Sequence, residues 1–193
     1  MFRTTSTSRH AAHSRRPLTR LATAGLATHV FFELAAGVGM PLASVLGPVP
    51  AAGLWAACTK AVRQAAGTRP ASSDAAFATL NGAGLAAVIA HLTSWPRQRT
   101  PIGLPWLRDC EGLGPELMRF YNPILYVSGI AALAAILQEN RSAPRHVPLL
   151  CLGLVPVIAA AQHREHRRLM KVAREHPRWW NRRLQHNGQL PTQ

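Results

Sequence analysis

Four apolar stretches alternate with polar segments along the chain, at residues 21–46, 75–93, 122–137 and 147–162. A helix rises about 1.5 Å per residue, so roughly 20 apolar residues cross a hydrocarbon core of about 30 Å. The first two stretches reach that length, whereas the last two have 16 residues each and also suit soluble core helices. The pattern predicts an all-α fold, an integral membrane four-helix bundle with short interfacial helices and basic cytoplasmic tails.

Helix-ending residues support these limits. Gly47, followed by proline, ends the first stretch, and Trp95, followed by proline, ends the second and serves as an interfacial anchor. Pro148 and Pro156 predict a kink in the fourth stretch. Beyond residue 163 the helix is expected to continue as far as Pro177.

The connections predict shorter elements. Residues 51–66 contain too little apolar bulk to cross a bilayer, so a short interfacial helix is expected there. Residues 96–121 are rich in Pro and Gly, and Gly114-Pro115-Glu116 is typical of the start of a short helix. Only the segment 139–147 joins the third and fourth stretches, which predicts an antiparallel hairpin.

The charge distribution gives an orientation. The net charge is +14, and the mean hydropathy of +0.01 hides the alternation of apolar and basic segments. The two tails and the 94–121 connection hold 17 Lys and Arg residues, and the other two connections hold 5. By the positive-inside rule, both termini are expected in the cytoplasm of a bacterium, with the chain in the plasma membrane. Because the cations flank apolar runs, anionic lipid headgroups are the expected partner and nucleic acid is not.

The sequence divides into a basic tail (1–20), a transmembrane domain (21–162) and a second basic tail (163–193). The first tail is rich in Ser, Thr and Arg and has no acidic residue, so it is expected to be disordered. A mitochondrial transit peptide, which would place the protein in the inner membrane, and a cleaved export signal are the alternatives. The second tail, cationic with a Trp pair, is expected to be cytoplasmic or to lie along an anionic membrane surface.

One face of the second stretch carries only small side chains. Ala78, Gly82, Ala86 and Ala90 recur every four residues, which lets another helix approach closely. This face is expected to contact other membrane proteins or a second copy of the chain, unless the stripe merely reflects the abundance of alanine. Asn81 is expected to form an interhelical hydrogen bond.

His29 and Glu33 are the most distinctive polar residues within the apolar stretches. They lie four residues apart within the first stretch, so they share a helix face. Ionisable groups inside a membrane mark functional sites, which favours a proton relay or an ion or substrate site. A structural role, one interhelical hydrogen bond, is the competing interpretation. No third ligand can be assigned, and His91 is expected at a different depth near the membrane interface, so no metal and no cofactor are predicted.

The 103–122 segment holds the remaining candidates. Asp109 and Glu111 flank Cys110, and such groups can do acid–base or nucleophilic work, although helix capping and pairing with arginines also explain the acids. The three cysteines form no disulfide or zinc-finger spacing. His163 and His166 share a helix face, but they stand among cations and predict a poor metal site.

The catalytic candidates are therefore His29, Glu33, Asp109 and Glu111. The sequence favours a small multi-pass membrane protein with a non-enzymatic accessory, scaffold or transport role. A membrane-embedded enzyme or a proton- or ion-handling protein that uses the His29–Glu33 pair is the alternative. A soluble nucleic-acid-binding protein is the remaining one, disfavoured by the long apolar runs.

Overall fold

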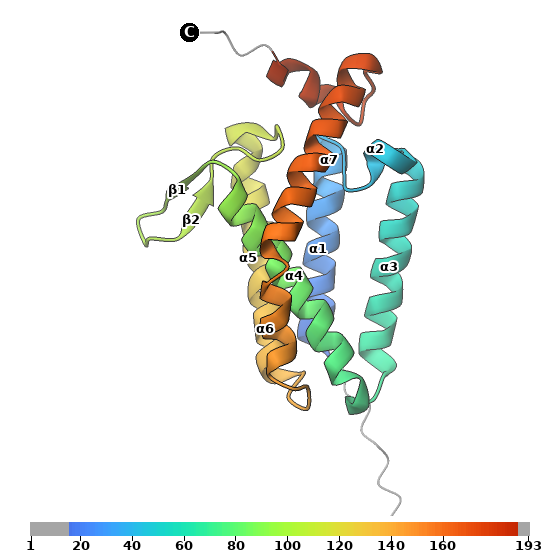
Figure 1. Cartoon of the computed structure of the whole chain (residues 1–193), viewed down its shortest axis with the longest axis vertical. Coiled ribbons are helices and arrows are strands. Elements are labelled where there is room, and N and C mark those ends of the chain that lie inside the picture. The colour runs from blue at the N-terminus through green and yellow to red at the C-terminus, as the bar shows by residue number, and fades with distance from the viewer. Residues whose placement is uncertain (1–15, 189–193) are drawn as a thin grey trace, which may run out of the picture.

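The computed structural model describes residues 16–188, in which five long helices lie along one axis (Figure 1). They are α1 (Pro17–Ala36), α3 (Pro48–Thr68), α4 (Asp74–Ser94), α5 (Gly114–Gln138) and α7 (Val155–Glu175). The shorter elements are α2 (Ala43–Leu46), η1 (Ala71–Ser73), β1 (Arg97–Arg99), β2 (Pro105–Leu107), α6 (His146–Leu152) and η2 (Arg182–Gly188). The fold is therefore mostly helical, as the sequence predicts, with one antiparallel β1–β2 hairpin projecting from the bundle.

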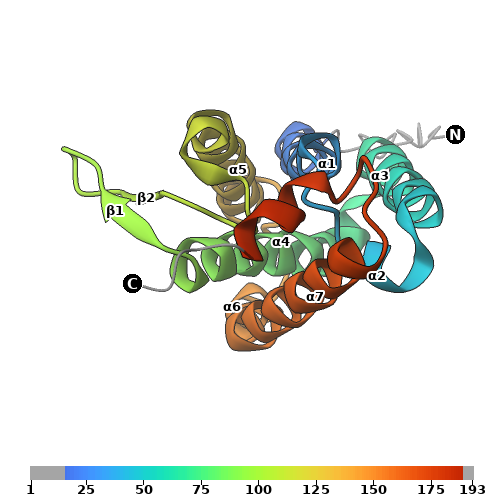
Figure 2. The same cartoon turned by 90° about the horizontal axis from the view of Figure 1, so that it is seen from above.

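Helix α4 lies in the middle of the bundle (Figure 2). It packs against α5 on one side and against α6 and α7 on the other, while α1 packs between α3 and α5. The predicted antiparallel hairpin of the last two stretches is therefore wrong in its packing, because α6 and α5 lie on opposite sides of α4 (Figure 2).

The first apolar stretch is not one helix, which corrects the predicted 21–46 span. α1 already begins at Pro17, inside the predicted disordered tail, and ends at Ala36, where Gly37 takes a left-handed conformation at φ 82°. Gly39 follows at φ 93°, and a Cβ atom there would come within 2.9 Å of the Leu169 side chain of α7. Only glycine tolerates both the left-handed backbone and that close approach, so the chain turns over the bundle end at this point.

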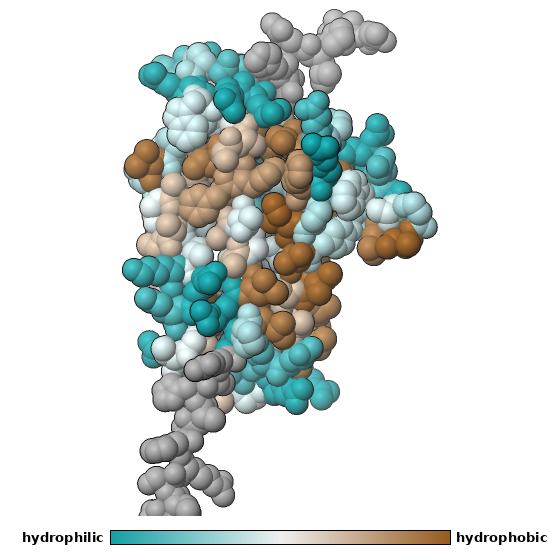
Figure 3. Space-filling model, turned by 180° about the vertical axis from the view of Figure 1, so that it is seen from behind, coloured by the Kyte–Doolittle hydropathy of each residue, from teal (hydrophilic) through white to brown (hydrophobic). Residues whose placement is uncertain are grey.

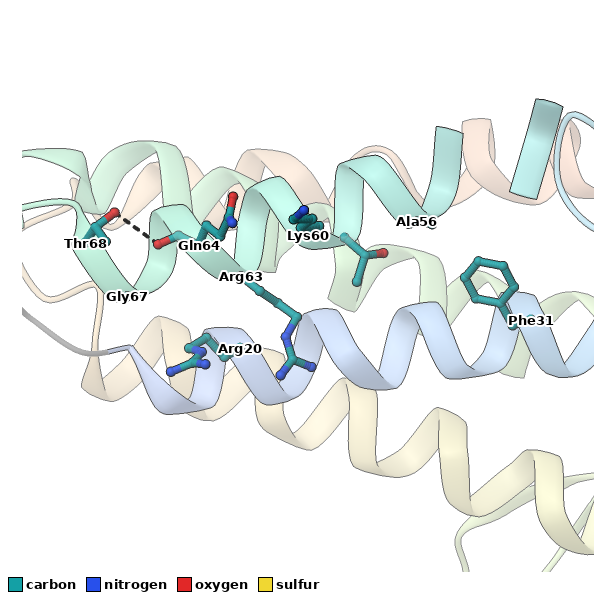
Figure 4. A pocket seen from close by; sticks show the side chains of 9 residues that line it. Arg20, Phe31, Ala56, Lys60, Arg63, Gln64, Gly67 and Thr68 are labelled. Carbon is teal, nitrogen blue, oxygen red and sulfur yellow. Dashed lines mark hydrogen bonds between the residues drawn. The ribbon is translucent and has the colours of Figure 1, made fainter. Parts of the chain in front are cut away.

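The segment expected as a short interfacial helix is instead the 21-residue helix α3, which runs antiparallel to α1 along the bundle (Figure 1). Its lower half and α1 enclose a cleft lined by the exposed cations Arg20, Lys60 and Arg63 (Figure 4). Because α3 adds a helix, the start of α1 and the η2 segment lie at opposite ends of the bundle (Figure 1). The four-span arrangement had placed both ends on one side.

The later helices follow the sequence more closely. α5 contains the predicted third stretch and begins at the Gly114-Pro115 pair, so the expected short helix there is the first turn of a long one. The kink predicted from the prolines is confirmed, since α6 ends at Leu152 and α7 begins at Val155 with Pro156 in its first turn. α7 then continues to Glu175, close to the expected end at Pro177.

Three of the described helical segments are long and apolar enough to cross a membrane: Ala71–Ser94, Gly114–Gln138 and His146–Glu175. Figure 3 shows apolar residues across the middle of the back face and hydrophilic residues gathered toward its two ends. In the 18-residue apolar window of the third segment, only 6% of the residues are buried within the chain, so most of its apolar side chains face outward. An outward-facing apolar surface of this kind suits contact with lipid.

The small-residue stripe of α4 packs inside the chain. Ala78, Gly82, Ala86 and Ala90 are all buried, and a Cβ atom on Gly82 would lie 2.8 Å from the Cβ atom of Cys151 in α6. The close helix approach predicted from the stripe is present. At Gly82 its neighbour is α6 of the same chain, so this part of the face packs within the chain.

A buried hydrogen-bond network, here called the helix-end network, ties the lower ends of the helices together. Arg16 donates to the carbonyl oxygens of Arg69 and Pro70 and to Asp74 Oδ1, at 2.7–2.8 Å. Glu139 accepts from the backbone N–H groups of Leu18 and Thr19 at 2.6 and 2.9 Å, and from the Thr19 hydroxyl at 2.9 Å. A carboxylate at these N–H groups also matches the positive end of the α1 dipole. Asn81 donates to Thr19 Oγ1 and Asn140 Oδ1 at 3.0 Å, which confirms its predicted interhelical role.

Candidate metal centre

His29 and Glu33 lie in the last two turns of α1 and face the bundle interior, where they are 4% and 1% exposed. One helical turn separates them, and His29 Nε2 lies 3.4 Å from Glu33 Oε1. That separation exceeds the 2.7–3.2 Å of an ordinary N–H···O hydrogen bond. The shared helix face predicted from the sequence is confirmed, and the two groups stand slightly too far apart to satisfy each other.

His91 joins this pair from the last turn of α4. Its Nε2 atom lies 3.9 Å from Glu33 Oε1, and its ring centroid lies 5.0 Å from that of His29. The expectation that His29 and His91 sit at different depths is therefore wrong, and His91 is buried within the bundle, with 4% of it exposed. With α3 inserted between them, α1 and α4 run in the same direction, so residues near their C-terminal ends come to the same level (Figure 1).

Tyr121 of α5 supplies the fourth side of the cluster. Its hydroxyl group donates a hydrogen bond to Glu33 Oε1, and the residue is fully buried. The interhelical hydrogen bond expected of the His29–Glu33 pair is thus present, and it joins Glu33 of α1 to Tyr121 of α5. Tyr121 also orients the carboxylate toward the two histidines, as outer-shell hydrogen-bond partners do for metal ligands.

The loop before α5 brings Cys110 and Glu111 to the same place. Glu111 has a left-handed backbone at φ 53°, followed by Gly112 at φ 87°, and this conformation is uncommon for a residue other than glycine. Asn122 fixes the start of the loop, accepting from the Leu107 N–H group at 2.9 Å and donating to the Leu107 carbonyl at 3.1 Å. Strained backbone of this kind persists where surrounding contacts hold it, and it clusters at functional sites.

The ligand atoms form two overlapping groups that share His91. His29, Glu33 and His91 make up the first group, and His91, Cys110 and Glu111 the second; within each group the nitrogen, oxygen or sulfur atoms lie within 4.8 Å of one another. We call these five residues the metal centre. They come from α1, α4 and the loop before α5, so no local sequence pattern unites them.

His91 is held with one nitrogen ready to bind a cation. Its Nδ1 atom lies 3.0 Å from the Ala87 carbonyl oxygen, which can only accept, so this contact is a hydrogen bond in the tautomer that carries its proton on Nδ1. Nε2, which faces Glu33, then keeps its lone pair. The Gln162 amide lies 2.7 Å from the same Nδ1 atom. Rotating this amide by half a turn places its oxygen there, and Gln162 Oε1 otherwise has no partner among the described residues.

Other nitrogens at the site remain without partners. In the part of the chain that the structure describes, His29 Nδ1 and His166 Nδ1 are buried and form no hydrogen bond. Buried polar atoms are nearly always paired, and an exception calls for an explanation such as an ion or a catalytic role. Two unpaired imidazole nitrogens beside one cavity therefore indicate a site that accepts a ligand.

The electrostatics of the site favour the protonated forms of Cys110 and Glu111 when no cation is present. Burial raises the pKa of Glu111 well above its ordinary value, and the neighbouring Glu33 and Glu165 carboxylates raise it further. The pKa of the Cys110 thiol is likewise raised well above its ordinary value, first by burial and then by Glu111 and Glu33. A bound cation would oppose both effects, because it favours the thiolate and the carboxylate.

A cavity of about 670 Å³ reaches the metal centre, and His29, Glu33, His91 and Glu111 line it. From α7 it is lined by Gln162, Glu165 and His166. The volume lies within the range of small-molecule sites, which are mostly apolar with a few convergent polar groups. The centre is therefore accessible to a ligand although its side chains are buried.

The remaining candidates from the sequence are not members of the two ligand groups, although His166 lines the same cavity. Asp109 Oδ1 accepts from the Gly114 N–H group at 3.2 Å, so it caps α5 as the structural interpretation proposed. The His163 and His166 rings pack against Trp95, with centroids 4.7 and 5.2 Å from it. Three of the four catalytic candidates line the cavity at the metal centre: His29, Glu33 and Glu111. The structure adds three site residues that the sequence did not assign, namely His91, Cys110 and Tyr121.

No protein-family model, no curated protein and no solved structure matches this chain.

Proposed function

We propose that this protein is an integral membrane metalloprotein that binds a divalent transition metal, Zn²⁺ first, at the metal centre. The observation that carries the proposal is the convergence of His29, Glu33, His91, Cys110 and Glu111 from three separate segments. Two imidazoles, two carboxylates and one thiol include every ligand type that Zn²⁺ uses in proteins.

The spacing of the ligand atoms supports a cation between them. Bonds of about 2.0–2.1 Å in a tetrahedral site place nitrogen and oxygen ligands roughly 3.3–3.4 Å apart. The two histidine nitrogens lie 3.4 and 3.9 Å from Glu33 Oε1, close to that value and too long for good hydrogen bonds. A small inward movement of His91 would complete a two-histidine, one-carboxylate set.

Such a set has two uses in enzymes. With Zn²⁺ it leaves one position for a water molecule whose pKa falls to about 7, and with Fe²⁺ it leaves positions for oxygen chemistry. Cys110 in the second group favours Zn²⁺, since thiolate is a soft ligand. The proposal therefore moves from the non-enzymatic role favoured by the sequence toward the alternative centred on His29 and Glu33, which gains a metal.

Metal binding to the full chain, purified in mild detergent, tests the proposal directly. After chelation and reloading, one Zn²⁺ per chain is expected by elemental mass spectrometry, and His91→Ala should abolish it. The exposed His146 provides the matched control, because His146→Ala removes an imidazole away from the centre. Co²⁺ loading should add a thiolate charge-transfer band that disappears in Cys110→Ser and persists in Cys58→Ser, Cys58 being the exposed thiol.

Different results would contradict the metal site and the membrane embedding. If wild type, His91→Ala and His146→Ala bind the same amount of metal, or none, the metal proposal is wrong. Preferential loading with Fe²⁺ over Zn²⁺ would correct the metal and keep the site. Membrane embedding is tested separately by carbonate extraction, where recovery of the chain in the soluble fraction would exclude it.

A further inference from the structure

The cavity at the metal centre extends away from it as an apolar groove among four helices. Both the polar residues of the centre and a set of apolar side chains line the same cavity. The connection after α1 contributes apolar residues to this lining, and from α1, α3, α4 and α7 the lining includes Leu26, Val30, Trp55, Leu80, Gly84 and Ile158. The cavity therefore combines the polar residues of the metal centre with an apolar lining.

Gly84 marks open space at the floor of the groove. A Cβ atom added to this residue would meet no described atom outside its own helix within 4 Å. Gly82, two residues earlier on α4, is by contrast pressed against Cys151, 2.8 Å from such a Cβ atom. The glycine at 82 thus serves helix packing, whereas the glycine at 84 leaves room that no part of the described chain fills.

Arg164 and Arg168 line the cavity at the point where the sequence of α7 changes from apolar to cationic. α7 is apolar up to Ala161 and cationic from Arg164 onward, which is the change expected where a helix passes from hydrocarbon to headgroups. Arg164 and Arg168 are exposed, lie one turn apart, and form no ion pair within residues 16–188. Glu165 between them is already held by Ser44, which donates its N–H group at 3.1 Å and its hydroxyl at 2.6 Å.

We propose that the groove holds the hydrocarbon chain of a single-chain anionic membrane lipid, whose headgroup lies between Arg164, Arg168 and the metal centre. The apolar lining fits the chain, the two arginines fit a carboxylate or phosphate, and the outward-facing α6–α7 segment places the groove beside the bilayer. This proposal rests on the proposed function for the metal, because the lipid is the class of substrate on which the metal would act.

Photo-crosslinking in phosphatidylcholine nanodiscs tests this assignment. The probe is palmitate with a diazirine in its chain, and the zinc-loaded full-length protein is irradiated and mapped by peptide mass spectrometry. Labelling is expected on the groove-lining parts of α4 and α7. Gly84→Leu should lower it at least about tenfold, because the leucine side chain fills the groove. Gly53→Leu is the matched control, since Gly53 is an exposed α3 glycine with equally open surroundings.

Two double variants test recognition of the lipid headgroup. Arg164→Gln with Arg168→Gln should weaken labelling by photoreactive palmitate several-fold and leave labelling by the uncharged photoreactive palmityl alcohol unchanged. Arg167→Gln with Arg174→Gln removes two exposed α7 cations that do not line the cavity, and should change neither. Equal loss for both probes would overturn the charged-headgroup part of the proposal.

Metal content of every variant separates the two proposals. Labelling that depends on Gly84 in a protein that binds no zinc would retain the lipid groove and reject the metal. Stoichiometric zinc with the same labelling in Gly84→Leu and Gly53→Leu, or with labelling spread over the outer faces of α5 and α6, would reject the groove and retain the metal. Should Gly84→Leu lose zinc through misfolding, Ile158→Trp blocks the opposite wall and decides the same question.

Discussion

The two buried polar clusters of the bundle differ in how they meet their hydrogen-bonding needs. In the helix-end network, charged and polar groups meet at 2.6–3.0 Å, and Arg16 and Glu139 each make three hydrogen bonds. In the metal centre, the two histidine nitrogens stand 3.4 and 3.9 Å from Glu33. The first cluster is closed on itself, and the second leaves space between its groups.

The unpaired atoms differ in kind as well. Among the described residues, the helix-end network leaves Arg16 Nε and Asn140 Nδ2 unpaired, and both of these atoms are hydrogen-bond donors that cannot bind a cation. Beside the metal centre, among the described residues, the imidazole nitrogens His29 Nδ1 and His166 Nδ1 are unpaired; an imidazole nitrogen can donate or accept, and the nitrogens that face Glu33 are the Nε2 atoms of His29 and His91. Burial of polar groups alone therefore does not identify a site. Spacing and lone-pair character separate a structural network from a functional one.

The largest expected effect comes from opening the closed cluster. Arg16→Leu leaves Asp74 buried without its ion-pair partner, which is 2.8 Å away, and removes two bonds to carbonyl oxygens. Breaking one half of a buried pair costs about 3–5 kcal/mol, so the unfolding temperature in detergent should fall markedly. Zinc stoichiometry of the protein that remains folded should stay unchanged. Loss of zinc without a loss of stability would show that the two clusters are not separate.

The same substitution in each cluster gives the sharpest contrast. Glu139→Gln places an amide NH₂ against N–H and O–H donors of α1 and should lower the free energy of unfolding by about 1.5–3 kcal/mol, with zinc affinity unaffected. Glu33→Gln still accepts from Tyr121, so stability should change by less than about 1 kcal/mol, while zinc affinity falls at least about a hundredfold. Denaturation curves and zinc competition titrations on both variants measure the two quantities. If both variants behave alike, the comparison fails.

Removing the outer hydrogen bond of the centre is expected to have a smaller effect. Tyr121→Phe deletes the donor to Glu33 and leaves the aromatic ring that packs beside His29 and Phe32. Outer-shell partners typically contribute about 10–100-fold to metal affinity. Competition against a chromophoric chelator measures this. Tyr126→Phe, which removes a hydroxyl bound to the Pro105 carbonyl, should leave zinc affinity unchanged.

The pH dependence is expected to be the mildest effect. Because Glu111 and Cys110 have raised pKa values, they hold protons that Zn²⁺ must displace, so zinc affinity should rise about tenfold per pH unit for each proton released. In the metal-free protein, by contrast, a rise in pH lowers the free energy of unfolding, because the folded state holds the Glu111 proton more tightly than the unfolded state does. The contribution of Glu111 is fully present below the ordinary pKa of 4.5 and is lost as the pH rises through the raised folded-state pKa.

Glu111→Gln should therefore flatten both profiles. Titrations of zinc affinity and of the unfolding temperature between acidic and neutral pH measure them. A zinc affinity that does not vary with pH in the wild-type protein would contradict ligation by Glu111 and Cys110.

The local helices could be predicted because their causes are local. Proline at helix starts, apolar runs of sufficient length and the break near Pro156 all lie within one segment, and α4, α5 and α7 follow them. The end of α1 at Ala36 was missed although Gly37 and Gly39 are visible in the sequence, because apolar content alone does not reveal a left-handed turn. α3 is predicted as a helix over 51–66, but not as a full-length member of the bundle, because its composition lacks the apolar bulk by which spans are recognised.

The sequence by itself determined the helical class, the outward-facing apolar segments, the shared face of His29 and Glu33, and the capping role open to Asp109. These follow from periodicity and spacing along one helix or turn. Only the tertiary structure decided that His91 and Tyr121 meet Glu33, and that Cys110 and Glu111 meet His91. The physical reason is α3: one more antiparallel helix reverses every later segment, makes α1 and α4 parallel, and brings two histidines far apart in the sequence to one level of the bundle.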